Sequence, residues 1–133
     1  MNYLKDKEIH NICEKYGIKN YTINLDGSID VDGNVNLQNK GLTKIPLKFN
    51  HVSGNFNCSY NKLTTLDGSP ERVGGSFYCN YNNLTTLEGG PQSVGGDFYY
   101  NVNPIYYKLG KIDYKSYIKQ LNRDKILNEL LNR

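Results

Sequence analysis

The chain has 133 residues, of which 38% are hydrophobic, and a formal net charge of +3 at pH 7. This length fits one domain with a modest core, and so small a net charge argues against a dedicated nucleic-acid binder. No run of 18 apolar residues occurs, and the charged start lacks the apolar stretch of a signal peptide. We therefore expect no membrane span and a cytoplasmic location. The odd number of cysteines, three, favours reduced thiols over a disulfide framework.

Residues 1–33 are predicted to form an N-terminal cap of one helix and short strands. Apolar residues at helical spacing predict a helix over 3–16, and Gly17 is placed to end it. Three alternating segments separated by Asp-Gly pairs then predict a small antiparallel meander, because Asp-Gly is a strong hairpin signal. The three segments cover residues 21–25, 28–31 and 34–37.

Residues 54–94 contain two copies of one pattern with a period of 21 residues, as the spacing of Phe56 from Phe77 shows. A fixed period of this length is typical of a solenoid, in which each coil buries its apolar face against its neighbours. Extending the period in both directions predicts about 3.5 coils over residues 34–105. The predicted fold class is therefore an α+β repeat solenoid with a cap at each end.

Each coil is predicted to begin with a short strand whose alternate residues face inward. In the first complete copy these are Phe56 and Cys58, and two leucines follow at the next bend. Asn61 falls where the chain must curve, so its amide can satisfy backbone groups that the bend leaves unpaired, and Asn82 repeats this one coil later. The equivalent slot of the preceding coil holds Lys40, so the amide ladder is expected to start one coil late.

These residues resemble a leucine-rich repeat, with Phe and Cys in the first two apolar slots. More specifically, three segments resemble the short repeat proteins encoded by tailed bacteriophages. They are Asn-Lys-Gly-Leu-Thr-Lys-Ile-Pro (39–46), Leu-Thr-Thr-Leu-Asp-Gly-Ser-Pro (63–70) and Leu-Thr-Thr-Leu-Glu-Gly-Gly-Pro (84–91). The resemblance covers about residues 20–105 and implies a leucine-rich-repeat-like stack that serves as a binding scaffold in the host cytoplasm.

Residues 106–133 are predicted to form a helical C-terminal cap. Asp113 and Asp124 can each cap a helix. The apolar residues after the two caps differ in helical phase, which suggests a break near Asn122 and Arg123, although one bent helix is an alternative. The two apolar sets are Tyr114, Tyr117, Ile118 and Leu121, and Ile126, Leu127, Leu130 and Leu131. These helices could also pair two chains in a homo-oligomer.

A candidate binding face comes from the strand residues that flank the inward pair, because they point outward and stack from coil to coil. This face is nearly uncharged and rich in Tyr and Asn, which supply contact area and adaptable hydrogen bonds. The predicted site residues are Asn57, Tyr60, Tyr78, Asn80, Tyr81, Tyr99 and Asn101. Gln38, Ser59, Asn36, Asn39 and Val102 complete the predicted face.

Three functions remain open for the chain. The favoured one is a non-catalytic module that binds a protein through this face, namely a host protein, such as one of antiviral defence, if a phage encodes the chain. The second is sequestration of a nucleotide-like ligand against the tyrosines of the face. The third, which rests on the apolar C-terminal helices, is a structural or oligomeric component associated with a virion. The alternative to any binding role is that Asn and Tyr simply suit short, solvated strands.

Other candidate sites are weak. Cys58 and Cys79 share an inward column and are interpreted as packed thiols, because neither histidine has a spacing that completes a zinc site. The segment 28–39 lacks the final Glu of a calcium loop. Four lysines recur at helical spacing and would share a face, most simply a solvated one. They are Lys108, Lys111, Lys115 and Lys119. No catalytic motif, metal site or cofactor is predicted.

Overall fold

The computed structural model describes residues 6–132. Helix α1 (Asp6–Tyr16) occupies most of the helix predicted over 3–16, and the first residues of that prediction lie outside the described range. Its inner face buries Ile9 and Cys13 completely. Gly17 ends the helix at a φ of 67°, a left-handed conformation that glycine adopts without strain.

Strands β1 (Tyr21–Ile23) and β2 (Ile29–Val31) form the predicted antiparallel hairpin around Asp26 and Gly27. The carboxylate of Asp26 accepts hydrogen bonds from the backbone N–H of Ser28 (2.9 Å) and its hydroxyl (2.6 Å). Lys48 donates to the same carboxylate at 3.2 Å. These hydrogen bonds lower the pKa of Asp26 to about 2, and the two bonds from Ser28 contribute more than the one from Lys48.

The predicted three-stranded meander is wrong in its third strand. Strand β3 (Val35–Asn36) does not pair with β2 but begins a second sheet. Gly33, with a φ of 132°, turns the chain from one sheet to the other. The second Asp-Gly pair therefore marks a solenoid corner, not a hairpin.

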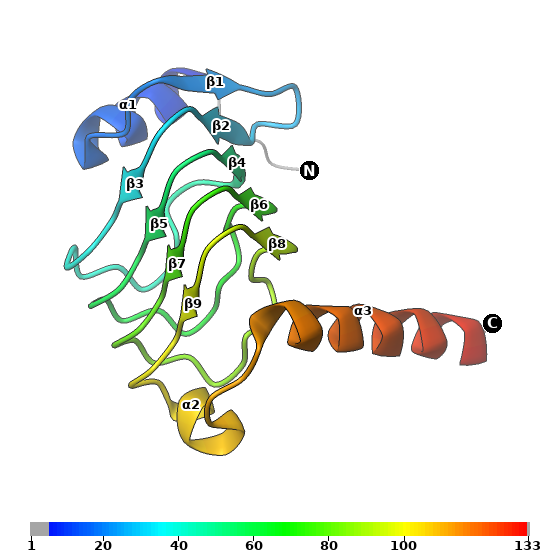
Figure 1. Cartoon of the computed structure of the whole chain (residues 1–133). Coiled ribbons are helices and arrows are strands. Elements are labelled where there is room, and N and C mark those ends of the chain that lie inside the picture. Colours follow the sequence, from blue (N-terminus) through cyan, green and yellow to red (C-terminus); the bar gives the residue numbers. More distant parts are fainter. Residues whose placement is uncertain (1–5, 133) are drawn as a thin grey trace.

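Two sheets form neighbouring sides of the solenoid that meet at a corner, as Figure 1 shows. One has the order β1-β2-β4-β6-β8, with β4 (Phe49–Val52), β6 (Arg72–Val73) and β8 (Ser93–Val94). The other has the order β3-β5-β7-β9, with β5 (Phe56–Asn57), β7 (Phe77–Tyr78) and β9 (Phe98–Tyr99). From β4 onward successive strands of each sheet pair in parallel at the 21-residue period, which confirms the repeat solenoid. Strands β4, β6 and β8 were not predicted from the sequence.

The inward residues stack in columns, as expected. The rings of Phe56 and Phe77 stack 5.3 Å apart, and those of Phe77 and Phe98 stack 5.1 Å apart. Cys58 and Cys79 are fully buried in the adjacent column. The leucines at the following bend are also fully buried, namely Leu63, Leu66, Leu84 and Leu87.

Glycine pairs form the corner between the two sheets. A Cβ atom at Gly74 would lie 2.2 Å from the backbone oxygen of Ser53, and one at Gly95 would lie 2.2 Å from that of Gly74. No side chain fits these positions, because the clashing atoms belong to the backbone of the preceding coil. The Gly-Gly pairs thus allow successive corners to stack at the strand spacing of about 4.8 Å.

A ladder of asparagine side chains joins the coils. The side-chain amide of Asn82 donates to the carbonyls of Cys58 and Cys79, both at 3.0 Å, and its oxygen accepts from the N–H of Leu63 at 3.0 Å. Asn103 repeats the pattern one coil later, and Asn61 begins it one coil earlier. The ladder starts at Asn61, as the sequence predicts from Lys40 in the preceding slot.

The C-terminal cap contains a short helix α2 (Pro104–Leu109) and one continuous helix α3 (Tyr114–Leu131). The predicted break near Asn122 is therefore wrong. The ring of Tyr114 stacks on Phe98 at 3.7 Å, which ends the phenylalanine column, and its hydroxyl donates to the carbonyl of Pro91 at 2.8 Å. Figure 1 shows α3 leaving the solenoid body and projecting away from it.

The phase shift along α3 reflects two apolar stripes on opposite sides of one helix. Ile118 and Leu127 are nine residues apart in sequence, which is about two and a half helical turns. The first stripe packs against the body, where Ile118 is buried. The second stripe is 50% to 80% exposed and comprises Ile126, Leu127, Leu130 and Leu131. We call it the distal leucine stripe.

The asparagine ladder yields a stability prediction. The substitution Asn82→Ala leaves the buried N–H of Leu63 unpaired and removes one of the two asparagine hydrogen bonds that the carbonyls of Cys58 and Cys79 each accept, so we expect the free energy of unfolding to fall by about 3 kcal/mol. Urea denaturation measures this loss. Asn83→Ala is the matched control, because Asn83 is exposed beside it and should change stability by less than about 0.5 kcal/mol. Equal effects of the two substitutions would contradict the proposed role of the ladder.

Candidate protein-binding face

Four tyrosines, two in strands of the second sheet and two just after its strands, form two parallel stacks, which we call the tyrosine face. The rings of Tyr60 and Tyr81 lie 4.4 Å apart at an interplanar angle of 9°. The rings of Tyr78 and Tyr99 lie 4.9 Å apart at 13°. Both ring spacings match the distance between neighbouring strands. The structure thus brings together all four tyrosines predicted for the site.

The tyrosine rings remain accessible although they stack. Tyr60 is 47% exposed, Tyr81 41% and Tyr99 40%, whereas Tyr78 is half-buried within the face. The hydroxyl of Tyr99 donates to the carboxylate of Asp97 at 3.2 Å. This hydrogen bond, together with the charge of Asp97, raises the pKa of Tyr99, so the phenol stays neutral at physiological pH.

The three asparagines predicted for the site are less exposed than Tyr60, Tyr81 and Tyr99. Asn57, Asn80 and Asn101 are all half-buried. The side-chain oxygen of Asn57 accepts a hydrogen bond from the N–H of Ser59 at 3.0 Å, so Asn57 shapes the local turn. Ser59, which was expected on the open face, is buried instead. Its hydroxyl donates to the side-chain oxygen of Asn57, so the two residues form one local hydrogen-bonded turn.

The backbone at the third outward slot of each coil is left-handed. Its φ is 56° at Asn39, 55° at Tyr60, 57° at Tyr81 and 55° at Val102. Asparagine tolerates this conformation, whereas for bulky and β-branched residues it is strained by about 1 kcal/mol or more. Two residues of the tyrosine face therefore stand where asparagine would fit the backbone better. Periodicity alone does not reveal this conformation.

The environment of the two stacked thiols favours packing over reactivity. Cys58 and Cys79 are fully buried, and burial raises the pKa of both thiols above the usual value of 9.0. Each thiol therefore stays protonated and packs as a small apolar group. Within residues 6–132 no group of three or more His, Cys, Asp or Glu side chains is placed to hold a metal ion.

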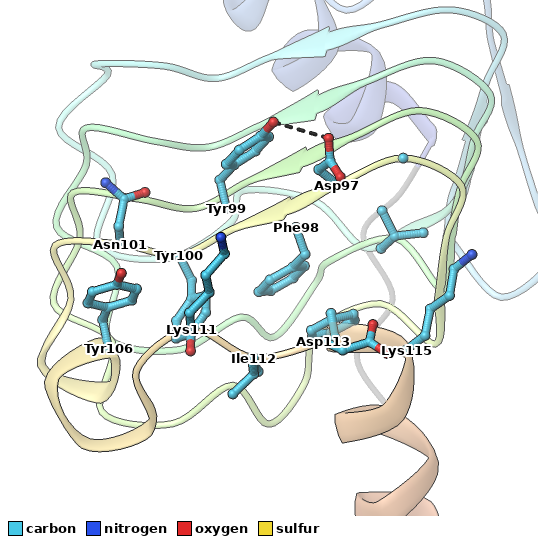
Figure 2. Close-up of a pocket in the computed structure, with 13 residues that line it drawn as sticks. Asp97, Phe98, Tyr99, Tyr100, Asn101, Tyr106, Lys111, Ile112, Asp113 and Lys115 are labelled. Atoms are coloured by element: carbon cyan, nitrogen blue, oxygen red, sulfur yellow. Dashed lines mark hydrogen bonds between the residues drawn. The ribbon is translucent and has the colours of Figure 1, made fainter.

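The four predicted lysines do not share one helical face. Helix α2 ends at Leu109, and Gly110, with a φ of 66°, redirects the chain, so Lys111 lies in the connector to α3. The structure instead brings Lys111 and Lys115 to a cavity of about 790 Å³ that Tyr99 also lines (Figure 2). Neither Lys108 nor Lys119 lines this cavity.

Comparison of the chain with family models, with curated proteins and with solved structures gives no match. The resemblance to bacteriophage repeat proteins therefore stays a prediction. None of the helices described between residues 6 and 132 has the length and apolarity needed to cross a membrane.

The left-handed slot yields a second prediction. Both Tyr81→Asn and Tyr81→Val remove the ring stack with Tyr60, but only asparagine also relieves the backbone strain. We expect the Asn variant to be more stable than the Val variant by about 1 kcal/mol. The Asn variant should lie within about 1 kcal/mol of the unsubstituted protein, because the lost stack and the relieved strain offset each other. Chemical denaturation measures both differences, and equal stability of the two variants would contradict the strain argument.

Proposed function

We propose that the chain is a non-catalytic protein-binding module that engages its partner through the tyrosine face. The observation that carries the proposal is the pair of parallel, exposed tyrosine stacks held on a regular backbone. Asn57, Asn80 and Asn101, which are half-buried, occupy neighbouring outward slots of the same coils.

Tyrosine suits recognition because it offers a large amphipathic surface and has little rotamer freedom to lose on binding. Stacking on the neighbouring coil restricts the rings further, so part of the ordering cost is met before the partner arrives. The left-handed backbone at Tyr60 and Tyr81 supports the same view. A sequence selected only for stability would favour asparagine at both positions, as at Asn39.

The residue types on the face favour binding over catalysis. Its slots hold Tyr, Asn, Ser, Gln and Val, and none of these is a histidine or carboxylate suited to general acid–base chemistry. The face is also small, because four stacked strands span only roughly 14 Å between the outer two. A standard interface takes about 20–30 residues per side. The partner is therefore expected to contact a flanking cap as well.

The resemblance to repeat proteins of tailed bacteriophages suggests the class of partner. We propose a protein of the host, for example one that serves antiviral defence, which the module binds and modulates in the host cytoplasm. The absence of charge on the tyrosine face favours a partner surface that is itself largely uncharged.

Replacing Tyr60, Tyr78, Tyr81 and Tyr99 together with asparagine tests the proposal. Each replacement already occurs in the same slot of another coil, at Asn36, Asn39 or Asn57, so the fold should persist. We expect affinity for captured host proteins to fall at least about tenfold, because tyrosines are frequent hot spots. Affinity capture from host lysate followed by binding measurements gives the result.

Tyr107→Ala is the control, since Tyr107 is 78% exposed but lies on α2, outside the tyrosine face. Undiminished recovery of every partner by the fourfold variant would exclude the tyrosine face as the site.

A second candidate is self-association through the distal leucine stripe. The stripe faces away from the solenoid body, and no described residue covers it. The charges beside it, Arg123, Asp124, Lys125 and Glu129, include two of each sign, so two copies would not repel each other. Four side chains provide much less than the roughly 800 Å² per partner of a standard interface, so the dimer would be weak.

Light scattering over a range of concentrations tests this candidate. The average mass should rise with concentration for the unsubstituted protein and stay monomeric for Leu130→Glu, because a buried unpaired charge opposes pairing. Asn128→Glu adds the same charge to the opposite side of α3 and should leave the association intact. A monomer at every concentration would remove self-association as a candidate.

A further inference from the structure

The last coil of the second sheet has a free backbone edge. In the earlier coils, the N–H groups at the two inward positions donate to carbonyls of the next coil. Phe56 donates to Ser76 at 3.0 Å, and Phe77 donates to Asp97 at 2.9 Å. Phe98 and Tyr100 occupy the same positions in the last coil, where no further coil follows. Their N–H groups have no acceptor among residues 6–132.

The cavity of about 790 Å³ follows this free edge. Its lining includes every residue from Gly96 to Asn101, and the connector and the start of α3 form its opposite wall (Figure 2). An extended stretch of that length spans about 17 Å at the usual rise per residue. An elongated cavity beside a strand edge fits an extended peptide better than a compact ligand.

The side chains at the cavity favour an acidic occupant. Lys111 and Lys115 form no ion pair with any residue between 6 and 132. In Figure 2, Lys111 extends from the connector and Lys115 from the first turn of α3. Two carboxylates also line the cavity, but Asp97 accepts a hydrogen bond from the hydroxyl of Tyr99, and Asp113 accepts one from the hydroxyl of Ser116. These bonds come from neutral hydroxyls and leave both carboxylates charged, but they direct Asp97 and Asp113 toward donors of the protein, whereas the ammonium groups of Lys111 and Lys115 have no acceptor among residues 6–132.

The cap limits which side chains the occupant can direct inward. Tyr114 stacks on Phe98 where the next phenylalanine of the column would lie, and Tyr106 packs edge-on against Tyr100 at 5.2 Å. Inward side chains of an added strand must therefore be small. Its outward side chains would lie beside Tyr99, where an aromatic ring could extend the existing stack with Tyr78.

We propose that this edge binds an extended acidic segment of a partner protein, which adds one parallel strand beyond β9. The carbonyls of the segment accept hydrogen bonds from Phe98 and Tyr100, and its acidic side chains meet Lys111 and Lys115. Strand addition at an exposed sheet edge is a common mode of peptide recognition. This site does not require that Tyr60 and Tyr81 bind anything, so it stands independently of the function proposed above.

A designed peptide tests the proposal with the complete protein. The probe is fluorescein-labelled Glu-Gly-Tyr-Gly-Tyr-Gly-Glu with a blocked C-terminus, which combines small inward residues, aromatic outward residues and acidic ends. Fluorescence polarisation should show saturable binding that weakens about tenfold in the double variant Lys111→Glu/Lys115→Glu. The double variant Lys108→Glu/Lys119→Glu makes the same charge change outside the cavity and should bind as the unsubstituted protein does. The same peptide with Lys in place of Glu should not bind.

Amide hydrogen exchange supplies the decisive readout. Bound peptide should protect the amides of Phe98 and Tyr100 at least tenfold, which a purely electrostatic surface contact would not do. The Tyr60→Asn/Tyr81→Asn variant should keep this peptide binding even if it loses the partner of the tyrosine face. Absence of binding, or binding without protection of these two amides, would overturn the proposal. Protection that rises with protein concentration before peptide is added would also overturn it, because a second copy would then be the occupant.

Discussion

The register between coils is the constraint on which the rest of the structure depends. Each buried asparagine of the ladder hydrogen-bonds the backbone of its own coil and of the preceding one, so a shift by one residue would leave several buried polar groups unpaired. The Gly-Gly corners enforce the same register sterically, since only glycine fits against the coil before it. Equivalent residues of successive coils therefore form columns. The tyrosine face consists of two such columns of outward-facing residues.

The left-handed backbone at the third outward slot of each coil connects the register between coils to the proposed binding function. Every coil turns at the same slot with a φ near 56°, because the repeated hydrogen bonds impose the same path on each coil. Asn39 adopts that conformation with little backbone strain, whereas Tyr60 and Tyr81 are strained in it. A residue that fits its backbone poorly but projects an ordered ring into solvent is expected where recognition, and not stability, selects the side chain.

The sequence predicts the features that show both a repeated spacing and several buried positions, and it misses those that are too short or occur once. The period identified the inward Phe, Cys and Leu columns and the start of the ladder at Asn61, since each depends on a spacing that occurs more than once. The strands β6 and β8 were missed because each has two residues and one buried position, too few to show alternation. The break predicted in α3 was wrong because a change of apolar phase was interpreted as a change of helix. The tyrosines of the site were predictable from their slots, but the meeting of Lys111 and Lys115 with Tyr99 depends on the turn at Gly110.

The two ends of the solenoid are closed in different ways, and this difference explains where the candidate surfaces lie. At the N-terminal end, β2 pairs with β4, so the cap continues the hydrogen bonding of the first sheet. At the C-terminal end, Tyr114 covers the phenylalanine column with a side chain, while the N–H groups of Phe98 and Tyr100 have no acceptor in the part of the chain that the structure describes. A side-chain cap shields apolar surface but cannot satisfy a strand edge. Because helix α3 also turns its second apolar stripe away from the body, the surfaces that still lack partners are concentrated at and beside the C-terminal end, where Tyr99 joins the tyrosine face to the cavity.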